Sequence, residues 1–292
     1  MEKRSVRYDT LVMKTLILGA KGMLGQELVK TFADHDLRAW DREECDVLSS
    51  DCEGKIKTFA PKLIVNVASY NDVDGAEGEG KEIAFALNAE APGRLARMAR
   101  EIDATFVHFG TDFVFDGAKG SYSEDDVPNP ISVYGTSKLK GEQAVLASGA
   151  RAYVIRLARL FGKPAASEGG KKSFVDIMLD LATKKDHLDL VDDEIASPTY
   201  APDLAAATRR IIETMPPGLY HAANAGKCSW YEFASEIFRL RNISIDISFV
   251  SGKMFPRPAS RPHDASLVSV KLSSQRSWQD ALREYLSTPY NL

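Results

Sequence analysis

Tyr134 and Lys138 stand four residues apart and together have side chains suited to moving a proton. They fall within an expected helix, where residues four apart share one face. A tyrosine hydroxyl has an ordinary pKa near ~10, so it exchanges a proton at neutral pH only when a nearby cation stabilises the phenolate. Lys138 supplies such a cation. The pair indicates acid–base chemistry, although tyrosine and lysine at this spacing also occur on ordinary helix surfaces.

Thr111 is a candidate partner for this pair. It follows an apolar run at 105–109, which predicts a buried strand that ends in a small polar turn. Ligands bind at the carboxyl ends of the strands in open α/β sheets. We expect the Thr111 hydroxyl to lie near Tyr134 and beside a substrate carbonyl or hydroxyl. The alternative is that Thr111 only caps the turn.

A glycine motif follows the first apolar run of the chain. Its sequence is Gly19-Ala20-Lys21-Gly22-Met23-Leu24-Gly25. The early glycines allow a tight turn and close approach to a pyrophosphate, and the last allows a helix to pack closely on the strand. The amino end of that helix then offers free N–H groups to phosphates. The strand before the motif and the helix after it predict a dinucleotide site.

Two residues after the second expected strand bear on the cofactor. Asp41 stands about 20 residues beyond the glycines, where an acid commonly contacts the adenosine ribose. Arg42 follows it and is suited to a 2′-phosphate instead. The pair is therefore compatible with both NADH and NADPH. Lys138 is also suited to hydrogen bonding with the nicotinamide ribose.

Alternation of strand and helix patterns predicts the fold that positions these residues. Expected strands span 15–18, 37–40, 63–67, 105–109 and 153–157, and expected helices span 24–33, 52–59, 81–101 and 134–147. Near-continuous apolar strands between helices are typical of a parallel sheet covered on both faces. Pro92 predicts a pause near Asn88 and a restart with the proline in the first helical turn. The fold class is α/β, a Rossmann-like doubly wound sheet.

The alternation weakens after residue 157, which predicts a second, smaller α/β domain. We expect residues 13–157 to bind NAD(P), with contributions from about 190–215, and 158–292 to form mainly a substrate-binding domain. Further helices are expected at 230–240 and 279–286. Residues 1–12 are expected to be an extension or disordered.

Composition excludes several classes of protein. A net charge of −4 argues against nucleic-acid binding, which usually needs a basic face. No run approaches the ~20 apolar residues of a membrane-spanning helix. Three cysteines are too few and too scattered for a disulfide framework or a zinc site, and the histidines lack metal-ligand spacing. We expect a cytoplasmic protein without a catalytic metal. A homodimer is compatible with the sequence.

Together these residues resemble the extended short-chain dehydrogenase/reductases, and within them the dTDP-4-dehydrorhamnose reductases. The likeness covers nearly the whole chain from Met13. Beyond the glycine motif it rests on Asp46-Val47, Val65-Asn66-Val67-Ala68, Val73-Asp74, Ala76-Glu77, Thr111-Asp112-Phe113-Val114-Phe115, Val133-Tyr134-Gly135, Lys138, Gly141-Glu142, Ser197-Pro198-Thr199, Gly218-Leu219-Tyr220-His221, Trp230-Tyr231 and Arg261-Pro262.

The resemblance implies a catalytic triad of Thr111, Tyr134 and Lys138 that reduces a 4-keto group of a nucleotide-linked deoxysugar, such as dTDP-4-dehydrorhamnose, with NADPH or NADH. It further implies cofactor contacts at Asp46, Val47, Ala68 and Ser69. Sugar contacts are implied at Asn71 and Val73.

The chain also departs from the family pattern on the sugar side. Arg159 stands where the family usually has a tryptophan, Lys171-Lys172-Ser173-Phe174 replaces a Gly-Asn-Asn-Phe pattern, Asn71 replaces a common threonine and Gly110 a common serine. Several cations are candidates for contact with a substrate diphosphate, although exposed basic side chains are more often merely solvated. They are Arg159, Lys171, Lys172, Arg257 and Arg261.

Two alternatives share this pattern. One is an epimerase or dehydratase that retains NAD+ between turnovers. The other is a non-catalytic cofactor-binding partner, like the regulatory subunit of methionine adenosyltransferase. All three triad residues are present, and a pure binding subunit has no chemical need for them. The reductase is therefore favoured.

Overall fold

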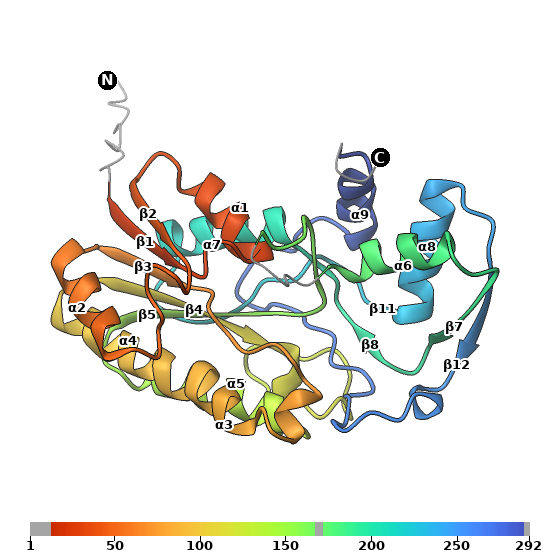
Figure 1. The fold of residues 1–292 in the computed structure, drawn as a ribbon, viewed down its shortest axis with the longest axis horizontal. Coiled ribbons are helices and arrows are strands. Elements are labelled where there is room, and N and C mark those ends of the chain that lie inside the picture. Colours follow the sequence, from red (N-terminus) through yellow and green to blue (C-terminus); the bar gives the residue numbers. More distant parts are fainter. Residues whose placement is uncertain (1–12, 167–171, 289–292) are drawn as a thin grey trace, which may run out of the picture.

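A six-stranded parallel sheet forms the centre of the computed structural model, which describes residues 13–166 and 172–288 (Figure 1). The strand order is β10-β5-β4-β3-β1-β2, and every neighbouring pair is parallel. The strands are β1 (Lys14–Leu18), β2 (Asp36–Trp40), β3 (Leu63–Asn66), β4 (Thr105–Thr111), β5 (Arg151–Leu157) and β10 (Gly218–His221). This sheet confirms the predicted doubly wound α/β class.

Helices cover both faces of the sheet (Figure 1). One face carries α1 (Met23–Thr31) and α7 (Ala201–Thr214), and the other carries α2 (Ser50–Phe59), α4 (Ala91–Glu101) and α5 (Val133–Leu146). Successive strand residues point to opposite faces. In β1, Leu16 and Leu18 enter the core with α2 and α4, while Ile17 enters the core with α1 and α7. Burial on both faces explains the near-continuous apolar runs in the sequence.

The pause expected in the helical pattern at 81–101 is present as a wider helical turn. A π-helical segment, η2 (Ala86–Glu90), joins α3 (Lys81–Phe85) to α4. Pro92 lies in the first turn of α4, as predicted, where its missing N–H costs no helical hydrogen bond. π-helical segments occur frequently at functional sites.

The C-terminal part of the chain packs around a second core, which contains Phe161, Phe233 and Tyr285 (Figure 1). Its helices are α6 (Phe174–Ala182), α8 (Trp230–Arg241) and α9 (Trp278–Leu286). Its strands are β6 (Leu160–Phe161), β7 (His187–Val191), β8 (Ile195–Ala196), β9 (Thr199–Tyr200), β11 (Cys228–Ser229) and β12 (Asp246–Val250). Short 3₁₀ helices complete the fold at η1 (Gly75–Glu77), η3 (Asp112–Val114) and η4 (Gly252–Met254). Both expected C-terminal helices are present.

The cysteines correct one expectation. Cys45 and Cys52 form a disulfide, with 5.2 Å between their Cα atoms, whereas the sequence suggested cysteines too few and too scattered for a disulfide framework. The segment after β2 turns back toward the start of α2, which brings the two residues together over a separation of 7. Cys228 is free and buried.

Two features are absent from the described residues. In 13–166 and 172–288, no helix is long and apolar enough to cross a membrane. Across the same residues, no group of three or more histidine, cysteine, aspartate or glutamate side chains is placed to hold a metal ion.

A buried ion pair joins α5 to β5. Glu142 accepts hydrogen bonds from Arg156 at 2.7, 3.0 and 3.1 Å, and the two residues are 1% and 2% exposed. Gly110 lies directly against this pair, where an added Cβ would overlap Glu142 Oε1. A side chain at position 110 would therefore have to displace the Glu142 carboxylate.

We expect Arg156→Met to lower the free energy of unfolding by about 3–5 kcal/mol, because it leaves the Glu142 carboxylate buried without its partner. Chemical denaturation measures the loss. The matched control is Arg283→Met, which breaks the exposed Arg283–Asp280 pair and should cost less than about 1 kcal/mol. Equal losses in the two variants would contradict the assignment of the Glu142–Arg156 pair as a major stabilising contact.

Candidate active site

The glycine turn after β1 is built for close approach. Gly19 has a φ of +82°, and a Cβ there would lie 2.9 Å from Ala68 N. At Gly25 an added Cβ would overlap the Gly19 carbonyl oxygen, so this glycine lets α1 pack against the turn. Gly22 is the N-cap of α1 and supplies no capping side chain. The N–H groups of the first turn are thus available to an anion.

Asp41 braces this turn against the end of β2. Its Oδ2 accepts a hydrogen bond from Lys21 N at 2.8 Å, and its Oδ1 accepts one from Arg42 N at 2.9 Å. The Arg42 side chain is 85% exposed and lies 3.5 Å from Asp46 at its Nε. Each Asp41 oxygen accepts one backbone N–H and keeps a further acceptor site for a ribose hydroxyl. The exposed Arg42 side chain is suited to a 2′-phosphate. The geometry is therefore compatible with either cofactor.

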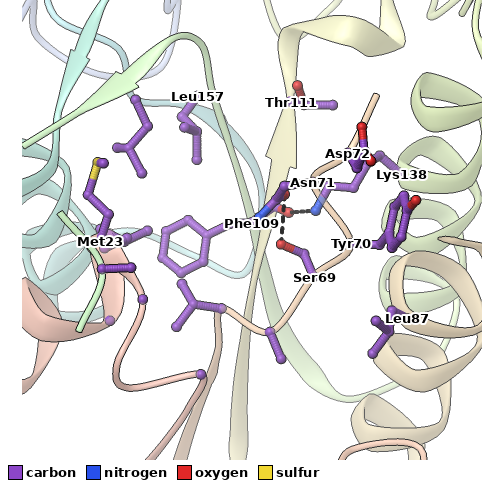
Figure 2. A pocket seen from close by; sticks show the side chains of 18 of the residues that line it. Met23, Ser69, Tyr70, Asn71, Asp72, Leu87, Phe109, Thr111, Lys138 and Leu157 are labelled. Carbon is purple, nitrogen blue, oxygen red and sulfur yellow. Dashed lines mark hydrogen bonds between the residues drawn. The ribbon is translucent and has the colours of Figure 1, made fainter. Parts of the chain in front are cut away.

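A cavity of about 910 Å³ runs from the glycine turn to α5. This volume is in the range of small-molecule sites. Figure 2 shows Thr111 and Lys138 on one side of it, with Met23 and Leu157 opposite. The predicted site residues that line it are Gly19, Gly22, Met23, Leu24, Gly25, Asp41, Arg42, Asp46, Val47, Ala68, Ser69, Asn71, Val73, Thr111, Tyr134, Lys138, Arg159 and Lys172.

Asn88 connects the loop after β3 to α5. This fully buried side chain accepts a hydrogen bond from Tyr70 N and donates to Tyr70 O and to Ser137 Oγ, at 2.9, 3.0 and 3.1 Å. At Gly141 of α5, a Cβ would overlap the Asn88 carbonyl oxygen. The π-helical segment therefore fixes α5 and the Ser69–Asn71 wall of the cavity at the same time.

Helix α5 delivers Tyr134 and Lys138 to the cavity as the spacing predicted. Ser132 caps the helix by accepting a hydrogen bond from Gly135 N at 3.0 Å. Tyr134 packs edge-on against Phe113, with ring centroids 5.5 Å apart. Lys138 Nζ donates to Phe109 O at 2.6 Å (Figure 2). Both reactive side chains are buried yet line the cavity.

Thr111 lies at the carboxyl end of β4 and also caps η3, because its Oγ1 accepts a hydrogen bond from Phe113 N at 3.3 Å. The same hydroxyl donates to Asp112 Oδ1 at 3.0 Å. The capping role and the place beside Tyr134, first considered as alternatives, are thus both present.

Burial dominates the proton affinities of the site. It raises the pKa of Tyr134 above its usual range, and the negative charge of Asp112 raises it further, while a hydrogen bond with Thr111 opposes the shift. Burial lowers the pKa of Lys138 to about 8, and the Glu142 charge opposes that shift. At neutral pH Tyr134 therefore carries its proton and Lys138 is mostly charged.

Arg159 forms a fixed part of the cavity wall. Its backbone has a left-handed φ of +43°, its Nη1 donates to Cys228 O at 2.7 Å and its Nη2 donates to Glu194 O. The guanidinium also stacks on Trp230, 3.9 Å from the ring centroid. These contacts hold the guanidinium in one position.

Among the other candidate cations, Lys172 lines the cavity, whereas Arg257 and Arg261 lie away from it. Arg261 pairs with both oxygens of Asp74 at 2.6 and 2.7 Å, Arg257 pairs with Glu194, and Lys21 pairs with Glu43 at 3.0 Å. None of these three side chains lines the cavity. Lys171 is outside the described residues.

The sequence analysis missed two buried polar residues of the site. Asp112 lines the cavity and is 4% exposed, yet we had assigned it no role. Asn88 was noted only as a pause in a helix. The signal for Asp112 was its place one residue after Thr111, at the carboxyl end of a strand. For Asn88, the pause itself was the signal.

The family model of the RmlD substrate binding domain matches residues 13–290. A dTDP-4-dehydrorhamnose reductase of Mycolicibacterium smegmatis is 35% identical over 297 residues, covering 97% of this chain and 88% of that protein. A protein of Streptomyces antibioticus, named as a probable dTDP-4,6-dihydroxy-2-methyloxan-3-one 4-ketoreductase, is 38% identical over 286 residues, covering 93% and 94%. The likeness thus extends along both chains.

A solved structure shows the same architecture. The dTDP-4-dehydrorhamnose reductase of Bacillus anthracis, in complex with NADP, has a TM-score of 0.88 and 30% identity. The match covers 94% of this chain and 98% of that one.

We expect Gly25→Ala to weaken NADPH binding at least about tenfold, because the added methyl group pushes α1 away from the turn that should hold the pyrophosphate. Titration of nucleotide fluorescence measures the affinity. Gly54→Ala is the matched control, since nothing lies within 4 Å of its added Cβ in α2. Unchanged affinity in a folded Gly25→Ala protein would remove the turn from cofactor binding.

Proposed function

The chain belongs to the RmlD substrate binding domain family, and from this premise we propose that it uses NAD(P)H to reduce a 4-keto group on a nucleotide-linked deoxysugar, as in the reduction of dTDP-4-dehydrorhamnose. One observation carries the proposal. Tyr134, Lys138 and Thr111 line the same cavity as the glycine turn. A proton donor and a nucleotide-binding turn thus open onto one space.

The described residues fit the cofactor. Gly19 and Gly25 leave room that a side chain would fill, and the uncapped first turn of α1 offers N–H groups to the pyrophosphate. We assign Asp41 or Arg42 to the adenosine ribose and Asp46 and Val47 to the adenine, since all four line the cavity. Ala68, Ser69 and Lys138 continue the same wall toward the reacting end.

When bound, the reduced nicotinamide supplies a hydride to the carbonyl carbon. Tyr134 then transfers its hydroxyl proton to the carbonyl oxygen, so the C=O becomes C–OH and a phenolate is left on Tyr134. The Lys138 ammonium stabilises that phenolate. Burial excludes water from the pair and strengthens this interaction.

The substrate side of the cavity supports a sugar nucleotide. Asn71 and Val73 lie on one wall, with Arg159 and Lys172 on the segments that follow β5. As part of this proposal, residues 158–292 form mainly the substrate-binding domain, and residues 13–157, with contributions from about 190–215, form the NAD(P)-binding domain. We further propose that Arg159 donates to the sugar rather than to the diphosphate, since its contacts with Cys228, Glu194 and Trp230 fix its position.

The relatives that are named dTDP-4-dehydrorhamnose reductase favour the reductase over the retained-cofactor epimerase and the binding subunit. Tightly bound NAD+ in the purified protein would favour the epimerase. The cytoplasmic location and the homodimer stay predictions.

The reductase assignment predicts that dTDP-4-dehydrorhamnose and NADPH give a loss of nicotinamide absorbance with the parent protein. Tyr134→Phe should lower kcat about 10²–10⁴-fold, because the proton donor is gone. NADPH affinity should stay within about twofold, because the ring and its packing remain. Tyr231→Phe, a tyrosine outside the cavity, serves as the control with parent activity. Parent-like turnover by Tyr134→Phe would remove this residue from its role.

A second prediction follows from Lys138. Because burial lowers its pKa to about 8, the ammonium is present below that pH and is lost as pH rises through it. The rate of the first turnover, followed by stopped-flow absorbance, should therefore fall above about pH 8. Lys138→Met should be slow throughout and should lack this decline. The same decline in that variant would assign the titration to another group.

A further inference from the structure

Asp112 is a buried acid beside the triad, and the mechanism above gives it no role. It is the first residue of η3, is 4% exposed and lines the same cavity as Thr111 and Tyr134. A carboxyl group out of water needs a hydrogen-bond partner or a proton of its own. Three neighbouring side chains interact with it: Thr111, Tyr134 on α5 and Arg159 on the turn after β5.

The single hydroxyl hydrogen of Thr111 is already used in a hydrogen bond. It points to Asp112 Oδ1, at 3.0 Å between the oxygens. Thr111 Oγ1 accepts from Phe113 N at 3.3 Å, and its hydrogen bond with Tyr134 lowers the pKa of Tyr134, the direction expected when Thr111 donates to the phenolate. A hydroxyl has one donor and two acceptor sites. While Asp112 holds its hydrogen, Thr111 has no hydrogen to donate to a substrate carbonyl or to a Tyr134 phenolate.

The state of Asp112 therefore controls Tyr134. An ionised Asp112 holds the Thr111 hydrogen, and its charge raises the pKa of Tyr134, which opposes formation of the phenolate. A protonated Asp112 has neither effect and can itself donate to Thr111 Oγ1. Burial raises the pKa of Asp112 to about 6, against the opposing effects of Thr111 and Arg159, so the protonated form is accessible in mildly acidic solution.

We propose that Asp112 is a proton-holding positioning residue, which restores the Tyr134 hydroxyl through Thr111 after each reduction. Once Tyr134 has given its proton to the carbonyl oxygen, the Thr111 hydroxyl passes its hydrogen to the phenolate. In the same step the Asp112 carboxyl passes its hydrogen to Thr111 Oγ1. Two O–H bonds form and two break, and the charge moves from Tyr134 to Asp112. Water regains access when product leaves and returns a proton to the carboxylate.

This inference rests on the proposed reductase function, and it separates the first turnover from later ones. Asp112→Asn keeps an oxygen that can accept from Thr111 but cannot release a proton. With NADPH and dTDP-4-dehydrorhamnose, its first turnover should stay within about threefold of the parent rate. Its steady-state kcat should fall about 100-fold, the size of one lost acid–base step. Asp125→Asn, at an exposed aspartate that does not line the cavity, is the matched control with parent kinetics.

The same experiment can overturn the inference. Equal reductions of both rates by Asp112→Asn would overturn it, since that result would assign Asp112 to the first proton transfer or to structure alone. Parent-like rates in both phases would also overturn it. If the parent protein shows no turnover at all, the reductase function fails, and the inference fails with it.

The parent protein offers a test that does not depend on folding of the variant. Its steady-state kcat should decline steeply as pH rises through about 6, the pKa of Asp112, whereas its first-turnover rate, which Asp112 affects only through the pKa of Tyr134, should decline less there and fall mainly as Lys138 titrates near pH 8. Identical pH profiles for the two rates would overturn the proposal. NADPH affinity, measured over the same pH range, controls for loss of cofactor.

Discussion

The close contact between α5 and the elements beneath it is the constraint on which the site depends. At Gly135 and Gly141 the helix approaches the Phe113 and Asn88 carbonyl oxygens more closely than any side chain would allow. The Asn88–Ser137 hydrogen bond and the Glu142–Arg156 ion pair hold it there. Interiors packed at this density transmit small displacements, so α5 positions its reactive side chains by leaving little freedom. Tyr134 and Lys138 are placed by the whole helix rather than by their own contacts.

The sheet explains why distant segments share one cavity. Parallel strands present their carboxyl ends at one edge, and there the turns after β1, β3 and β4 meet. The C-terminal part closes the same space from another side. Gln26 Nε2 donates to Pro164 O at 2.9 Å, and Ala166 N donates to Lys21 O at 2.8 Å, so the segment after β6 rests on the glycine turn. The nucleotide and the sugar are thus expected to meet where the two parts touch.

Much of this arrangement could be predicted from residues alone, because local rules determine it. Strands β1 to β5 lie within a few residues of the expected ranges, and β1, β3, β4 and β5 are mostly buried, which leaves continuous apolar runs. The helices α6 and α7 were not predicted. The buried face of α7 contains three alanines and becomes recognisable only through its contact with α1. Strands of two residues, such as β6 and β9, have no pattern to detect.

In the candidate site, the position of Tyr134 could be predicted but the charges around it could not. The Cys45–Cys52 pair, the hydrogen bond from Thr111 to Asp112 and the stacking of Arg159 on Trp230 all depend on the path of the chain in space. The same holds for the departures from the family pattern. Arg159 in place of an aromatic residue suggests a changed sugar contact when it is read alone, and Gly110 in place of serine suggests a lost hydroxyl.

Both residues have neighbours that affect the proton affinities of the site. Gly110 accommodates the Glu142 carboxylate, whose charge helps to keep Lys138 protonated, and Arg159 favours the ionised form of Asp112. A buried charge is costly unless another compensates it. Both departures therefore act on the same balance, the proton affinities of the groups around Tyr134. A substitution at either position should be judged by its effect on proton transfer as well as by its contact with the sugar.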